Sequence, residues 1–132
     1  MKEAYLELKD LTKSFGSDSD KVMAVDHINL QVKEGDLVTL LGPSGCGKTT
    51  TLRMIAGFHT PTGGDVYIDG VSMNQIPPNK RPTAMVFQNY ALFPHMTVFE
   101  NIAYGLRIRK ESNDEVKRKV EDIMRLTGLE NL

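Results

Sequence analysis

The most constraining feature of the sequence is an eight-residue segment, Gly42 to Thr49, that contains three glycines and a lysine. It matches the pattern G-x-x-x-x-G-K-[ST] at every fixed position. Glycines let such a loop curl until successive backbone N–H groups point inward at the oxygens of an anion. A glycine turn followed by an ordinary exposed lysine is the simpler alternative. The loop, however, stands between an apolar run and an amphipathic helical pattern, which is the context expected of a phosphate-binding loop.

The helix predicted after this loop begins near Lys48. Its apolar residues recur at helical spacing from Leu52 to Ala56, and Gly57 is suited to end it. The start of a helix adds free N–H donors and a positive dipole end to a phosphate site. Lys48 would supply a cation to the β- and γ-phosphates, and the Thr49 hydroxyl would be a ligand of Mg²⁺.

Strand patterns occur elsewhere along the chain. Residues 6–11 form a short amphipathic stretch, and residues 28–33 alternate apolar and polar side chains as a half-buried strand does. Residues 66–68 precede an Asp-Gly turn. Residues 37–41 and 84–87 are short, mostly apolar runs, which suit strands covered on both faces of a parallel sheet. These patterns predict an α/β fold.

Two further helices are predicted near the C-terminus. Thr97 and Glu100 form a capping box for the first. Asn113 is suited to cap the second, and Gly128 is suited to end it.

Composition limits the class of protein. A chain of 132 residues fits one domain. Its net charge of −1 gives no electrostatic reason to expect nucleic acid as a partner. A single cysteine, Cys46, excludes an internal disulfide framework. The N-terminus has no apolar core of a signal peptide, and no run reaches the ~18 apolar residues needed to span a bilayer. We therefore expect a cytoplasmic protein whose membrane role, if any, is peripheral.

The amino-acid sequence on both sides of the loop resembles that of a known family. The segment from Leu41 to Gly57, LGPSGCGKTTTLRMIAG, closely resembles the ATP-binding cassette (ABC) ATPases. The segment from Val86 to Val98, VFQNYALFPHMTV, does so too and is more specific, because many NTPases share the first loop. The resemblance extends from about Leu6 to the end. The ALFPH wording is similar to that of importers for polyamines, ferric iron and maltose.

This resemblance implies a P-loop NTPase fold of the ABC ATPase type. We expect an N-terminal antiparallel β subdomain, an incomplete RecA-like core and the start of the helical subdomain. Residues 1–132 would then be the N-terminal part of one ABC ATPase domain. Residues 1–88 would form the β subdomain and P-loop core, and residues 89–132 would form the Q-loop and the start of the helical subdomain.

The resemblance also assigns roles to single residues. Gln88 matches the Q-loop glutamine, which contacts Mg²⁺ and the attacking water, so Lys48 and Gln88 are the expected catalytic residues. A glutamine that simply caps a strand is the alternative. Phe15 matches the aromatic residue that stacks on adenine, although a lone Phe before a glycine often belongs to a core. The expected ATP-binding residues are Phe15, Gly42, Pro43, Ser44, Gly45, Cys46, Gly47, Lys48, Thr49 and Thr50, with Thr49 and Gln88 on the metal.

Apolar residues crowd the loop after Gln88: Tyr90, Leu92, Phe93, Pro94 and Met96. Such residues either fold into a local core or form an exposed docking patch. The family places this region against a coupling helix of the membrane subunit, which favours docking. The expected partners are transmembrane permease subunits and a second ATPase subunit, with the protein peripheral on the inner face of the plasma membrane.

Catalysis in the family also needs a Walker B strand, with Asp and Glu, and a Ser-Gly-Gly-Gln signature. We find neither. Asp69 follows an apolar run, but Gly70 stands where Glu is required. We therefore expect a truncated product, a split half or an excised piece. Alone it should not hydrolyse ATP, and it should fold poorly or self-associate.

Three functions remain open. The first is the ATPase subunit of a transporter whose activity resides in a longer form. The resemblance indicates that this transporter is a solute importer. The second is a nucleotide-binding module that does not hydrolyse ATP. The third is a soluble ABC protein acting on DNA or ribosomes, which the importer-like segment and the near-neutral charge disfavour.

Overall fold

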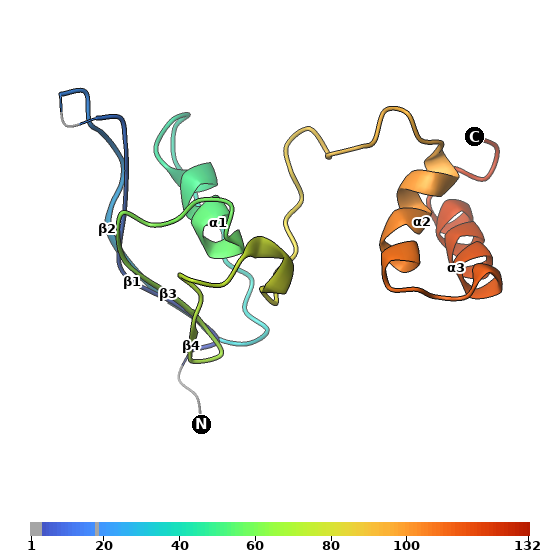
Figure 1. Cartoon of the computed structure of the whole chain (residues 1–132), viewed down its shortest axis with the longest axis horizontal. Helices are drawn as coiled ribbons and strands as arrows, with labels where there is room; N and C mark the ends of the chain where they lie inside the picture. The colour runs from blue at the N-terminus through green and yellow to red at the C-terminus, as the bar shows by residue number, and fades with distance from the viewer. Residues whose placement is uncertain (1–3, 18) are drawn as a thin grey trace. The chain divides into compact units, whose positions relative to one another are not determined.

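The computed structural model describes residues 4–17 and 19–132, which form two compact units, Met1–Met85 and Val86–Leu132 (Figure 1). The first holds a β-sheet and a helix, and the second holds two helices. Among the described residues, no helix is both long and apolar enough to cross a membrane.

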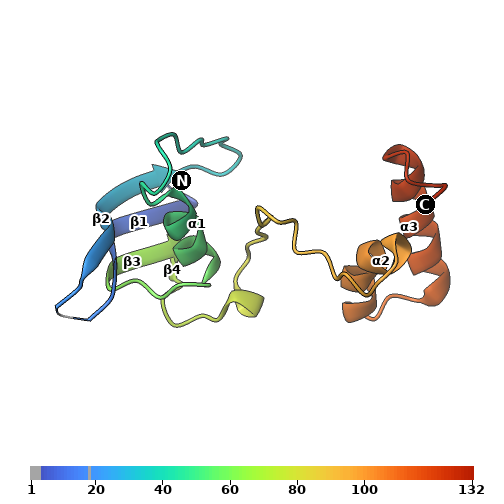
Figure 2. The same ribbon diagram turned by 90° about the horizontal axis from the view of Figure 1, so that it is seen from above.

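The first unit is built on a four-stranded sheet with the order β2-β1-β3-β4 (Figure 2). Its strands are β1 (Leu6–Phe15), β2 (Val22–Val32), β3 (Gly63–Ile68) and β4 (Val71–Ser72), and each neighbouring pair is antiparallel. The three strands predicted at residues 6–11, 28–33 and 66–68 are confirmed, and β1 and β2 are longer than predicted.

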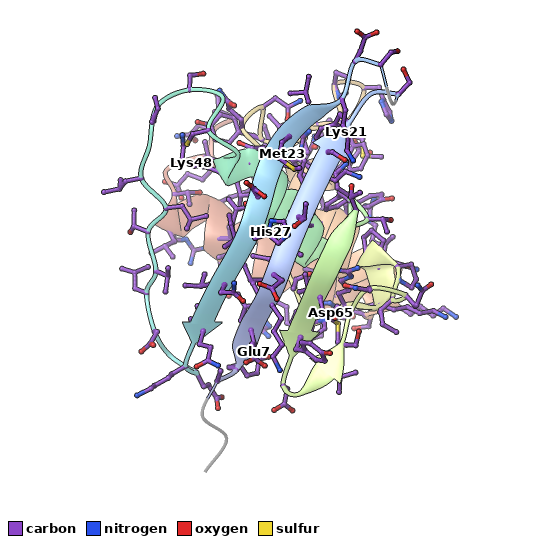
Figure 3. The ribbon with its side chains drawn as sticks, turned by 90° about the vertical axis from the view of Figure 1, so that its left-hand side faces the viewer. Glu7, Lys21, Met23, His27, Lys48 and Asp65 are labelled. Atoms are coloured by element: carbon purple, nitrogen blue, oxygen red, sulfur yellow. The ribbon has the colours of Figure 1, made fainter. Side chains whose placement is uncertain are left out.

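Helix α1 (Lys48–Ala56) begins and ends where the sequence predicts, with Gly57 as a left-handed C-cap, and it packs on one face of this sheet. The core between sheet and helix consists of Leu8, Leu11, Val25, Met54, Val66, Ile68 and Met73. Glu7, His27 and Asp65 lie on the opposite, polar face of the sheet, which Figure 3 views from the front. The apolar face of the sheet therefore supports α1 and the end of the glycine-rich loop before it.

Two strand predictions are wrong. Residues 37–41 and 84–87 form no strand, and Leu37, Leu41 and Val86 are 96%, 88% and 83% exposed. A strand exists only when another strand accepts and donates its backbone hydrogen bonds. The described part of the chain provides no such neighbour to either segment, so apolar composition alone does not order them as strands.

The second unit pairs α2 (Val98–Ile108) with α3 (Asn113–Leu126). Their common core is Ala103, Val116, Val120 and Met124. The predicted Thr97–Glu100 capping box is present. The predicted cap of α3 is wrong by one residue, because Ser112 accepts from the Glu115 N–H and Asn113 is the first helical residue.

Candidate functional site

The loop from Gly42 to Gly47 leads directly into the start of α1. Gly47 is the N-cap residue, and no side chain caps this helix start. The first helical bond runs from the Thr51 N–H to the Gly47 carbonyl, at 2.9 Å. The N–H groups of Lys48, Thr49 and Thr50 therefore stand at an uncapped, positively polarised helix end. This is an arrangement that binds anions.

Glycine is required at two positions of the loop. Gly45 and Gly47 have φ angles of +82° and +94°, which side chains with a Cβ rarely adopt. A Cβ at Gly47 would also overlap the Ala24 carbonyl oxygen of β2, whereas a Cβ at Gly45 would meet nothing within 4 Å. The end of the loop is thus pressed against β2, while its tip is open.

The Lys48 ammonium lies within the loop. Its Nζ donates to the carbonyl oxygens of Gly42 and Pro43, each at 2.7 Å, and lies 3.4 Å from the Cys46 Sγ. The Cys46 thiol itself is exposed. The loop therefore curls around a cation next to an uncapped helix start, which is a suitable setting for a polyphosphate.

The threonines after Lys48 have different environments. Thr49 is exposed, and its hydroxyl has no hydrogen-bond partner in the described ranges. Thr50 is half-buried. Thr51, which sequence reasoning did not select, is buried and donates to the Gly47 carbonyl at 3.0 Å. Thr51 thus secures the turn from which Lys48 and Thr49 project.

A hollow of about 240 Å³ borders the loop on its sheet side. Its lining joins Cys46, Gly47 and Lys48 to apolar side chains of the sheet and of residues 39–41. The described residues contain no group of three or more His, Cys, Asp and Glu side chains that could hold a metal ion.

Phe15 lies at the same end of the sheet as the loop. It is the last residue of β1 and pairs with Val22, two residues before the Ala24 against which Gly47 packs. Two strand residues span about 7 Å, and neighbouring strands lie about 5 Å apart. The residue is 41% exposed. Phe15 is therefore not a core residue, and its ring is available to an aromatic ligand.

Sequence reasoning missed Arg81, which lies in a connection expected to be on the surface. Its side chain is buried, with only 8% of the residue exposed. Its Nε donates to the Ile76 carbonyl at 2.8 Å, and its Nη1 donates to the Met54 and Ile55 carbonyls at 2.8 and 2.9 Å. Burial lowers the pKa of Arg81. Arg81 therefore caps the C-terminal end of the helix whose N-terminal end forms the loop.

Gln88 and the apolar loop after it belong to the second unit. Gln88 is exposed. Of the five apolar residues, Tyr90, Leu92 and Pro94 are exposed, whereas Phe93 and Met96 are half-buried. The Phe93 ring lies 4.6 Å from that of Tyr104 on α2. Two of the five residues are therefore anchored locally and three are exposed, and docking to a partner stays a prediction.

Asn101 holds the anchored part of this loop. Its Oδ1 accepts from the Phe93 N–H at 2.9 Å, and its Nδ2 donates to the carbonyls of Phe93, Met96 and Thr97 at 3.2, 3.2 and 3.0 Å. Sequence reasoning had no signal for it, because an Asn inside a helix is usually exposed. One side chain thus fixes the turn that follows Tyr90 and Leu92.

Comparisons with known proteins agree with this geometry. Residues 25–132 match the family described as ABC transporter. The chain is 53% identical over 125 residues to the alpha-glucoside transport ATP-binding protein AglK of Rhizobium meliloti, covering 92% of this chain and 33% of AglK. It is 49% identical to the spermidine/putrescine import ATP-binding protein PotA of Legionella pneumophila, covering 96% and 34%. The Fe(3+) ions import ATP-binding protein FbpC of Vibrio cholerae is 44% identical, with 99% and 36% covered.

Solved structures lead to the same family. The ATP-binding cassette MJ0796, in a dimeric post-hydrolysis state bound to ADP and Pi, superposes with a TM-score of 0.83 at 30% identity. The match covers 96% of this chain and 58% of that one. The chain thus spans about a third of the length of the curated relatives it matches. With its glycine-rich loop, its antiparallel sheet and these likenesses, the chain belongs to the ABC transporter family.

Proposed function

We propose that this chain provides the ATP-binding loop of an ATPase subunit that drives a solute importer. The observation that supports this most directly is the Lys48 ammonium held inside a glycine loop at an uncapped helix start. Backbone N–H groups of the segment from Gly42 to Thr50, except Pro43, would donate to phosphate oxygens. Lys48 would move from the Gly42 and Pro43 carbonyls onto the phosphates, since a charged pair is stronger than a bond to a neutral carbonyl.

The remaining site residues take the roles that the family resemblance implies. The free Thr49 hydroxyl would be a ligand of Mg²⁺, with Gln88 as a second one that also orients the attacking water. Magnesium would supply positive charge that balances the phosphate oxygens. Phe15 would stack on adenine through its exposed ring. The relatives named for alpha-glucoside transport, spermidine/putrescine import and Fe(3+) ions import support importers as the functional class.

We propose further that Tyr90, Leu92 and Pro94 contact a transmembrane permease subunit, with Phe93 and Met96 supporting them from below. The protein would then work at the cytoplasmic face of a membrane through that permease, as one of a pair of ATPase subunits. The dimeric state of the MJ0796 cassette supports the pairing.

Titration calorimetry of Lys48→Ala tests the proposal. A charge-assisted contact is worth about 1.5–3 kcal/mol, so the variant should bind ATP roughly 10- to 150-fold more weakly. Lys80→Ala, which removes an equal charge at an exposed position of the same unit, is the control and should bind as the unmodified chain does. Equal ATP affinity of folded Lys48→Ala and the unmodified chain would refute the phosphate site.

A further inference from the structure

The Phe15 ring is held by two side chains that the functional assignment leaves unused. The His59 ring approaches it edge-on, with centroids 5.4 Å apart and an interplanar angle of 76°. The Lys13 Nζ lies 5.1 Å from the Phe15 centroid and donates to the Thr60 carbonyl at 2.7 Å. These contacts join the end of β1 to the segment that follows α1.

Two further hydrogen bonds join the end of β1 to the segment after α1. The Thr62 N–H donates to the Thr12 carbonyl at 2.8 Å, and the Ser14 N–H donates to the Thr62 Oγ1 at 3.1 Å. His59 is thereby held opposite Phe15 although it is 44 residues away in the sequence. Its own N–H donates to the Arg53 carbonyl of α1 at 3.2 Å, so His59 is tied to the end of that helix.

His59 also has the chemistry of an aromatic support. Burial lowers its pKa, and the positive charges of Arg53 and Lys13 lower it further. The lowered pKa favours the neutral imidazole, whose ring contacts that of Phe15. Edge-to-face pairs of aromatic rings are favourable because the positive edge of one meets the negative face of the other.

We propose that His59 and Lys13 are positioning residues that fix the Phe15 ring as the platform for the nucleobase of a bound nucleotide. This inference rests on the proposed ATP site. A ring held in one orientation loses less conformational entropy when a base stacks on it, and so binds more tightly. The Lys13 cation draws on the π electrons of the ring, which reduces their repulsion with the π electrons of a purine.

The experiment compares two ligands, ATP and inorganic tripolyphosphate, on the whole chain by titration calorimetry. Only ATP has a base. His59→Ala should weaken ATP binding roughly 3- to 10-fold, the range of an aromatic pair, and leave tripolyphosphate binding unchanged. His59→Phe keeps an edge-on ring and should restore ATP affinity. Lys13→Met keeps the aliphatic stem and should reproduce part of the His59→Ala effect.

A second arm separates positioning from general damage. In a Phe15→Ala background, His59→Ala should have no further effect on ATP, because the platform is already absent. The inference is overturned if His59→Ala weakens both ligands equally, if it leaves ATP binding unchanged, or if its effect persists without Phe15. If the unmodified chain binds tripolyphosphate no better than Lys48→Ala does, the proposed function is refuted, and this inference with it.

Discussion

Replacing Arg81 by methionine should loosen the phosphate loop from the far end of its helix. Arg81 donates to three carbonyls, of which Met54 and Ile55 belong to the last turn of α1. The Met54 carbonyl also accepts from the Gly57 N–H at 3.2 Å. In the described part of the chain, the Ile55 and Ile76 carbonyls have Arg81 as their one donor. Methionine would fill similar space but leave both carbonyls without a donor.

The magnitude follows from these two carbonyls. A polar group that loses its partner in a partly buried site costs about 1–2 kcal/mol, and two such carbonyls are affected. We therefore expect Arg81→Met to lower the free energy of unfolding of the first unit by about 2–4 kcal/mol. Arg81→Lys should recover about half of this loss. A lysine ammonium is a single donor group and cannot reach all three carbonyls as the planar guanidinium does.

Hydrogen exchange measured by mass spectrometry is the assay, since it reports each helix separately. A loss of 2–4 kcal/mol corresponds to amide exchange in α1 that is roughly 30- to 800-fold faster. Exchange in α2, which belongs to the other unit, should not change. Lys80→Met is the matched control, because Lys80 is exposed and adjacent. Unchanged α1 exchange in Arg81→Met, or equal acceleration in Lys80→Met, would refute the capping role.

Three further predictions concern single side chains. The exposed Cys46 thiol lies within the loop, so saturating ATP should slow its reaction with a maleimide; an equal rate with and without ATP would contradict a phosphate cradle. The pKa of His59 is lowered in the folded state, so the unfolded chain binds more protons and stability should fall as the pH drops below about 6.5. In His59→Gln the urea midpoint of unfolding should depend less on pH between pH 6.5 and 5. The same dependence on pH in both proteins would exclude this linkage. Asn101→Asp removes the donors to three carbonyls and should speed exchange in residues 89–97 by an amount equivalent to about 1–3 kcal/mol, whereas the exposed Asn113→Asp should not.

The predictions that succeeded rest on local signals. The start of α1 at Lys48 follows from the glycine-rich turn before it and the amphipathic pattern after it. The capping box at Thr97 and the glycine after α1 are likewise properties of a few neighbouring residues. The alternation in residues 28–33 follows from one covered and one polar sheet face, which is what β2 has.

What the sequence left unpredicted depends on distant partners. The runs at residues 37–41 and 84–87 have strand composition, but pairing is decided by another segment. Arg81 was assigned to the surface because its acceptors, Met54 and Ile55, lie 27 and 26 residues earlier. The contact between Phe15 and His59 has the same origin. Long-range contacts of this kind leave no periodicity along the chain.

Gly45 and Gly47, the two loop glycines with a positive φ, should differ in the substitutions that they tolerate during evolution. At Gly45 the backbone conformation is the single obstacle, and asparagine or aspartate adopts that conformation more readily than other residues do. At Gly47 a second obstacle is added, because any Cβ would strike the Ala24 carbonyl of β2. A chain under relaxed selection should therefore drift at position 45 before position 47, and a library of variants at the two sites should recover that order.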